Sequence, residues 1–209
     1  MGVNVIGECI IDDNAAKAAA KTEIVRRYYR ALTDLKKGTV TPDVPERIKL
    51  LMNELNISES DRPVVKAAND KRAKSGNLPS ACLEIDQKYI VGRKTGYLSP
   101  ISSTILNTLK TLSKIPDEVD LISPSVLEPI LKIKNKTSNF KESYLKLGEV
   151  LIALSICSTT NPVVEKALEH LDKLSGTELH STHMITDEEM IILSNLGVNA
   201  TSGTEIDIN

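Results

Sequence analysis

Residues 76–100 of the chain, GNLPSACLEIDQKYIVGRKTGYLSP, decide the fold class. The opening Gly-Asn-Leu-Pro is a turn-rich junction at which a purely helical pattern ends. Ser80–Ile85 and Tyr89–Arg93 then predict two short strands of a hairpin that is joined at Asp86-Gln87. Ser99-Pro100 follows with the residues that favour a helix start, a serine N-cap and a proline at the first helical position. A hairpin followed by a helix is typical of a layered α/β domain.

Strands and helices continue to alternate after this stretch. Short apolar runs predict a buried strand at Val119–Ile122, a strand at Glu178–Ile185 and a last strand near Val198–Thr201. Capping signals predict helices that begin at Ser123-Pro124 and Asn161-Pro162 and a further helix that opens with a capping box at Thr186–Glu189. The apolar stretch Leu147–Cys157 predicts a buried central helix. The pattern predicts the α/β class, with a three-layer α/β/α domain over residues 77–209. Its small sheet is expected to be mixed, because the first pair is a hairpin and later connections pass through helices.

Residues 1–76 are expected to form a helical subdomain. Asp12 and Asp13 can cap a long helix that ends at Gly38, and two more helices follow. Residues 17–49 carry nine basic and four acidic side chains, whereas residues 165–209 carry nine acidic and two basic ones. The basic surplus indicates either a solvated helix surface or a contact with an acidic partner or anionic ligand.

Composition excludes several classes of protein. The formal net charge is -2 and aromatic residues are 3% of the 209, so we expect no nucleic-acid partner. The longest near-apolar run, Val150–Cys157, is far shorter than the roughly 20 residues of a membrane span, so no membrane partner is expected either. Three scattered cysteines fit neither a disulfide scaffold nor a zinc site, which favours a cytoplasmic location. No metal and no cofactor are predicted.

The loop Gly92–Gly96 is the first candidate site. It lies between a predicted strand and a predicted helix, so Lys94 and Thr95 come close to the hydroxyls of Ser99, Ser102 and Ser103. Helix N-termini attract anions, and the loop therefore predicts anion or phosphate binding, although it lacks the P-loop spacing. The alternative is an ordinary exposed loop before a capped helix.

A second group of candidates follows from sheet geometry. Ligands of open α/β sheets collect beyond the carboxyl ends of strands, and Ser123 and His183 are expected at such ends. Ser181 and Thr182, which precede His183 on its strand, are further candidate ligand-binding residues. Thr160 and Asn161 precede another helix and can face the same cleft. His180 is a candidate general acid or base, with a buried structural histidine as the alternative. Metal binding by His180 and His183 is not expected, because their side chains diverge on a strand.

Eight segments of the chain resemble a bacterial and archaeal family catalogued as a domain of unknown function, number eighteen forty-six. They are Met1–Asp13, Glu23–Tyr29, Asp61–Val65, Leu121–Pro124, Glu128–Ile130, Glu149–Ser155, Thr160–Pro162 and His180–Thr182. The resemblance implies that the chain corresponds to the C-terminal half of a longer two-part protein, whose N-terminal half carries a Gly-Ser-Gly-Lys-type phosphate loop. It also implies a helical insertion beside a three-layer α/β/α unit, and no established activity. The chain departs from the family at Gly92–Gly96 and after His183.

Two functions follow as hypotheses. The first is a ligand-binding or assembly module of a longer two-part protein, with a phosphate-bearing small molecule as the candidate ligand. The second is a small enzyme that acts on a phosphorylated or anionic metabolite in a cleft near Lys94 and His180. Val3, Val5, Ile6, Ile10 and Ile11 crowd the N-terminus without a helical period, which predicts a homo-oligomer or a complex with a separately encoded N-terminal half. The alternative is that this stretch folds back on its own domain.

Overall fold

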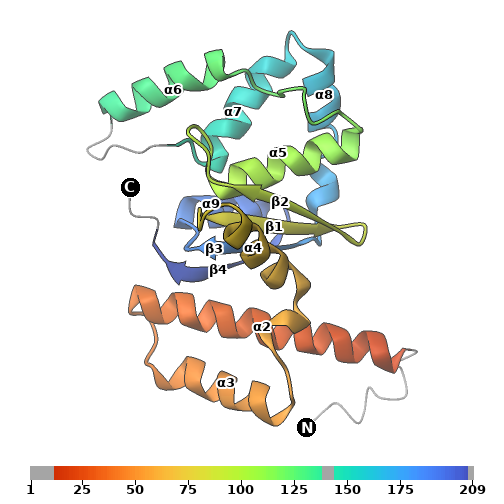
Figure 1. Cartoon of the computed structure of the whole chain (residues 1–209), viewed down its shortest axis with the longest axis vertical. Coiled ribbons are helices and arrows are strands. Elements are labelled where there is room, and N and C mark those ends of the chain that lie inside the picture. The colour runs from red at the N-terminus through yellow and green to blue at the C-terminus, as the bar shows by residue number, and fades with distance from the viewer. Residues whose placement is uncertain (1–11, 138–143, 207–209) are drawn as a thin grey trace. The chain divides into compact units, whose positions relative to one another are not determined.

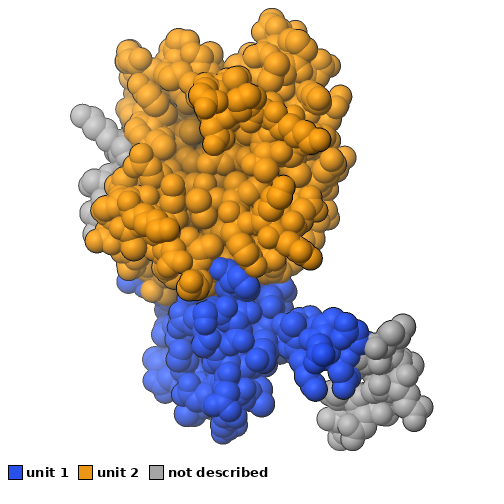
Figure 2. Space-filling view, turned by 45° about the vertical axis from the view of Figure 1, so that its right-hand side comes forward, with its two compact units in different colours: residues 1–63 blue, residues 64–209 orange. Residues whose placement is uncertain are grey.

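The computed structural model describes residues 12–137 and 144–206 (Figure 1). The expected contribution of Val3–Ile11 to association therefore lies outside the described residues. By packing, the chain divides into two compact units, residues 1–63 and residues 64–209 (Figure 2). The boundary expected at residue 76 would place the helix Pro63–Lys74 in the first unit. The division after residue 63 places nearly all of this helix in the second unit. No helix within the described ranges is both long and apolar enough to span a bilayer.

The first unit is helical. It contains α2 (Asp13–Lys37), α3 (Asp43–Glu54) and the short 3-10 helix η2 (Glu59–Asp61). The long helix begins and ends as its sequence predicts: the Asp12 side chain accepts hydrogen bonds from the first turn, and Gly38 ends it with φ 74°. Tyr29 is 7% exposed, and its hydroxyl donates to Glu59 Oε2 over 2.6 Å, which ties α2 to η2.

A four-stranded sheet forms the centre of the second unit. Its strands are β1 (Ser80–Ile85), β2 (Lys88–Arg93), β3 (Glu178–His183) and β4 (Asn199–Glu205), in the order β2-β1-β3-β4. β1 is antiparallel to both neighbours, and β3 is parallel to β4, so the expected mixed sheet is confirmed. Asp86 and Gln87 have φ values of 50° and 60°, which is the type I′ geometry of a two-residue hairpin turn.

Helices cover both faces of this sheet (Figure 1). On one face lies α4 (Pro63–Lys74), whose Val64 and Ala68 pack on Cys82. On the other lies α5 (Pro100–Ser113), whose apolar face packs on Ala81 and Leu83. The remaining helices are α6 (Pro124–Thr137), α7 (Leu147–Ser158), α8 (Pro162–Leu168), η3 (Leu171–Leu174) and α9 (Asp187–Asn195). The α/β fold expected from the sequence is confirmed.

Two of the expected elements are wrong in detail. Residues 119–122 form bends instead of a strand: Leu121 and Ile122 are buried, but Val119 is 40% exposed. A short apolar run fits a buried loop as well as a strand. The second error is α7, which is not buried all round, because Ile152 and Ile156 are 65% and 64% exposed. The helix buried against the sheet is α5.

Candidate functional site

The carboxyl ends of three strands lie along one edge of the sheet. Because β2 and β3 are both antiparallel to β1, they point the same way, and β4 runs parallel to β3. The ends of these strands, Arg93, His183 and Glu205, therefore share an edge. Ser123 does not belong to this set, since no strand precedes it; it is exposed, and its hydroxyl lies 2.8 Å from that of Ser125.

The N-terminus of α5 is occupied by a side chain of the protein itself. Ser99 is 1% exposed and caps the helix by accepting a hydrogen bond from Ser102 N–H over 3.1 Å. Its hydroxyl donates to Glu189, a carboxylate that is 4% exposed. Ser102 is also buried, and its hydroxyl donates to Leu145 O over 3.3 Å. The hydroxyls of Ser99 and Ser102 are thus hydrogen-bonded within the protein, and Ser99 links the start of α5 to a carboxylate of α9.

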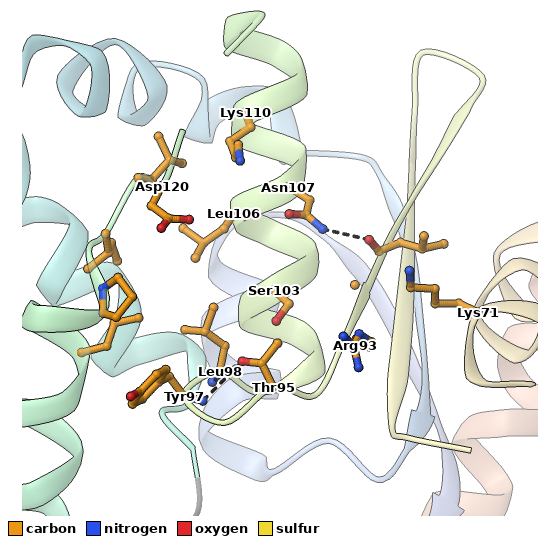
Figure 3. Close-up of a pocket in the computed structure, with 16 residues that line it drawn as sticks. Lys71, Arg93, Thr95, Tyr97, Leu98, Ser103, Leu106, Asn107, Lys110 and Asp120 are labelled. Carbon is orange, nitrogen blue, oxygen red and sulfur yellow. Dashed lines mark hydrogen bonds between the residues drawn. The ribbon is translucent and has the colours of Figure 1, made fainter. Parts of the chain in front are cut away.

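A pocket of about 340 Å³ lies beside the edge strand β2, between α5 and the start of α6 (Figure 3). It is formed entirely within the second unit. Its apolar wall consists of Leu98, Leu106, Leu121, Ile122, Pro124 and Leu127. Sites for small ligands commonly measure about 300–1,000 Å³, so this pocket is of the size that holds one small metabolite.

Cationic side chains reach the pocket from three elements. Arg93 comes from the end of β2 and Lys71 from α4, and Figure 3 shows their charged groups on the same side. Within residues 12–137 and 144–206, neither the Lys71 ammonium nor the Arg93 guanidinium has an ion pair or hydrogen bond. A third cation, Lys110 of α5, is 9% exposed, and its ammonium donates to Asp117 O over 2.6 Å.

Hydroxyl and amide groups complete the polar lining. Ser103 is 7% exposed, and its Oγ has no hydrogen-bond partner in the described part of the chain. Thr95 lines the pocket too, and its Oγ1 accepts the N–H of Leu98 over 3.0 Å. The Asn107 side-chain amide donates to Val91 O over 2.9 Å, which fixes α5 to the edge strand. A buried hydroxyl without a partner costs about 1–3 kcal/mol, so Ser103 contributes an unsatisfied polar group to the wall of the pocket.

Of the predicted site residues, Thr95 and Ser103 line this pocket. Lys94 instead lies over the ring of Tyr144, with its Nζ 4.9 Å from the ring centroid. Thr160 and Asn161 are exposed at the start of α8, where Asn161 Oδ1 accepts Val163 N–H over 3.0 Å. Two of the nominated residues thus line this pocket, whereas Lys94, Thr160 and Asn161 do not.

His180 lies on the α4 face of the sheet, not on the α5 face. It is paired with Cys82, and cross-strand neighbours share a face. The imidazole is 1% exposed, and its Nδ1 lies 2.9 Å from Thr201 Oγ1. This arrangement fits the alternative of a buried structural histidine.

Ser181 and Thr182 are buried at the end of β3. Ser181 lines a cavity of about 30 Å³ together with Ser99 and Glu189, which is room for a single water. Thr182 Oγ1 accepts Ser80 N–H over 3.1 Å and lies 3.0 Å from His183 Nδ1. Ser181 Oγ accepts His183 N–H over 3.3 Å, so both hydroxyls have partners within the fold.

Sequence reasoning missed several lining residues. Arg93 stands inside the candidate loop, next to Lys94, and strand alternation gave a signal that the two side chains diverge. Lys71, Asn107, Lys110 and Asp120 belong to elements that the sequence did not bring together. No local pattern connects α4 with the segment before α6, so only the folded chain reveals this group.

A charged network lies at the end of the parallel pair. The Arg72 guanidinium donates two hydrogen bonds to the Glu205 carboxylate, over 2.8 and 2.6 Å. These bonds are the main reason that the pKa of Glu205 lies below its ordinary value. His183 Nε2 lies 3.6 Å from the same carboxylate. Across the described ranges, no group of three or more His, Cys, Asp or Glu side chains is arranged to hold a metal ion.

Comparison with known proteins identifies the family. A family model described as the C-terminal part of domain of unknown function DUF1846 matches residues 60–207, and the model of its N-terminal part matches residues 1–56. The expectation of a C-terminal half alone is therefore too narrow, because the chain includes residues of both domains.

Relatives carry the name UPF0371 protein. One from Clostridium tetani is 40% identical over 98% of this chain, and one from Fusobacterium nucleatum is 40% identical over 97%. One from Streptococcus thermophilus is 38% identical over 96% of the chain. The chain spans 42%, 42% and 41% of the length of these three relatives, respectively. With both domain models matched, the chain belongs to the DUF1846 family.

Proposed function

We propose that the second unit is a binding module for a small phosphate-bearing metabolite, held in the pocket beside β2. One observation carries this proposal: two cations without ion pairs in the described chain, Lys71 and Arg93, reach a pocket that also holds the unpartnered Ser103 hydroxyl. Arginine offers several N–H donors in a planar fork, and lysine adds a point charge. Such a pair suits a dianionic phosphate.

The proposal is tested by calorimetric titration of the protein with phenyl phosphate. We expect Arg93→Gln and Lys71→Gln each to weaken binding by roughly 10–100-fold, since a hydrogen bond to a charged group contributes about 1.5–3 kcal/mol. Lys88→Gln is the matched control, because this exposed lysine of the hairpin has the same charge and does not line the pocket. Equal affinities of all three variants and the unchanged protein would refute the site.

We also propose that the chain associates with itself or with the remaining part of a longer protein. Three exposed leucines support this: Leu50 and Leu51 of α3 and Leu55, which directly follows the helix, are 61%, 42% and 51% exposed. Contiguous apolar surface commonly marks an interface. Light scattering at micromolar concentration tests the proposal with Leu51→Asp, which should shift the protein toward a 22.8 kDa monomer. A monomer before the substitution would exclude self-association.

A cytoplasmic location is part of the same proposal. Cys82 and Cys157 are free thiols in the described residues, and free cysteines are typical of reducing compartments. Fractionation of cells that express the protein tests this directly: recovery from the cytosolic fraction is the expected result.

A further inference from the structure

The pocket has a second polar end. Asp120, from the segment before α6, and Lys110, from α5, both line it. Figure 3 shows them on the opposite side of the pocket from Arg93 and Lys71, with Leu106 and Ser103 between. The Asp120 carboxylate has no hydrogen bond or ion pair in residues 12–137 and 144–206. The Lys110 ammonium donates one N–H to Asp117 O, so two of its three N–H donors remain for a ligand.

The charges of this second end sum to zero, so a charged ligand group gains no net attraction from the pair. An ammonium is attracted by Asp120 but repelled by Lys110, and a phosphate or carboxylate is attracted by Lys110 but repelled by Asp120. A neutral group that both donates and accepts hydrogen bonds is attracted by both side chains. Hydroxyl groups have this property, because each carries one donor and two acceptor lone pairs.

Leucines make up most of the wall between the two ends, beside Ser103. Leu98, Leu106 and Leu121 lie on it, so the body of the ligand must present an apolar face, as the C–H groups of a sugar ring do. The volume of about 340 Å³ is near the lower end of ordinary ligand sites, which suits a monosaccharide and not a dinucleotide.

We propose that the ligand is a phosphorylated polyhydroxy compound of the sugar phosphate class. Its phosphate binds Lys71 and Arg93, and its distal hydroxyls donate to Asp120 and accept from Lys110. This inference rests on the proposed anion site and adds the chemistry at the other end.

Two probes test the distal end: D-glucose 6-phosphate and cyclohexylmethyl phosphate. Both carry a CH₂–O–phosphate on a six-membered ring, but only the first has hydroxyls. In calorimetric titrations we expect Asp120→Ala to weaken binding of glucose 6-phosphate by about tenfold, the effect of one hydrogen bond to a charged group. Binding of cyclohexylmethyl phosphate should change less than twofold.

Asp117→Ala is the matched control. It removes the same charge three residues away, its side chain does not line the pocket, and its backbone carbonyl remains for Lys110. If Asp120→Ala weakens both probes equally or neither, the hydroxyl assignment is overturned while the phosphate site stands. If neither probe binds the unchanged protein, the proposed function itself is overturned.

Discussion

The hydroxyl of Ser99 donates a hydrogen bond to Glu189 Oε1 over 2.9 Å. The same oxygen accepts the N–H of Leu147 over 3.1 Å. Ser99 caps α5, Leu147 is the first residue of α7, and Glu189 lies in the first turn of α9. Three helix N-termini, each with a partial positive charge, thus meet one buried carboxylate. The start of α5 therefore faces a carboxylate of the chain itself.

Replacing this carboxylate should destabilise the second unit. We expect Glu189→Ala to lower the free energy of unfolding by about 2–4 kcal/mol, because it leaves Ser99 Oγ–H and Leu147 N–H buried without their acceptor. Urea unfolding followed by circular dichroism measures the change. Glu188→Ala changes an exposed position one residue earlier. It should lower the free energy of unfolding by less than about 1 kcal/mol, as substitutions at surface sites usually do. Equal losses for both variants would contradict the role assigned to Glu189.

Gly92 allows β2 to approach α5. A Cβ at this position would meet Thr104 N and Thr104 Oγ1 far inside van der Waals contact. Gly92→Ala should therefore cost about 1–3 kcal/mol, as overpacking does elsewhere. Gly96→Ala is the control, since no heavy atom lies within 4 Å of its added Cβ. Thermal unfolding of both variants gives the comparison, and an unchanged melting temperature for Gly92→Ala would show that the strand can move away.

Glu205 should make stability depend on pH in the acid range. The hydrogen bonds from Arg72 lower the pKa of its carboxyl in the folded state below the ordinary value of 4.5. A lowered pKa means that the unfolded state binds the proton more readily, so the stabilisation is present above pH 4.5 and is lost as pH falls through the folded-state pKa. We expect the stability difference between the unchanged protein and Glu205→Gln to shrink progressively as the pH is lowered from 6 toward 3. A constant difference over that range would contradict this linkage.

Local signals in the sequence predicted most of the elements of the fold. The hairpin turn at Asp86-Gln87, the Ser99-Pro100 start of α5 and the Asp12 cap of α2 each depend on a few neighbouring residues. Such contacts are encoded within one turn of chain. The apolar run at Val119–Ile122 was ambiguous because no such local signal is present there. Its burial comes from tertiary packing.

The pocket could be predicted only in part. Its loop wall, with Thr95 and Ser103, follows from one continuous stretch of sequence. Lys71 and Asp120 are separated by two strands and one helix, and no periodicity relates them. The pairing of Cys82 with His180 likewise decides which face His180 occupies, and this long-range register left no trace in the residues around the histidine.

The central position of β1 has a consequence for how the chain folds. Its pairing with β2 closes a two-residue turn, which hairpins achieve in about 1–10 μs. Its pairing with β3 joins Cys82 to His180, about a hundred residues later. At a synthesis rate of roughly 5–20 residues per second, the ribosome needs about 5–20 seconds to deliver that partner. During this interval one edge of β1 is open, so we expect nascent chains that are stalled before residue 178 to be bound by chaperones and sensitive to protease until β3 emerges.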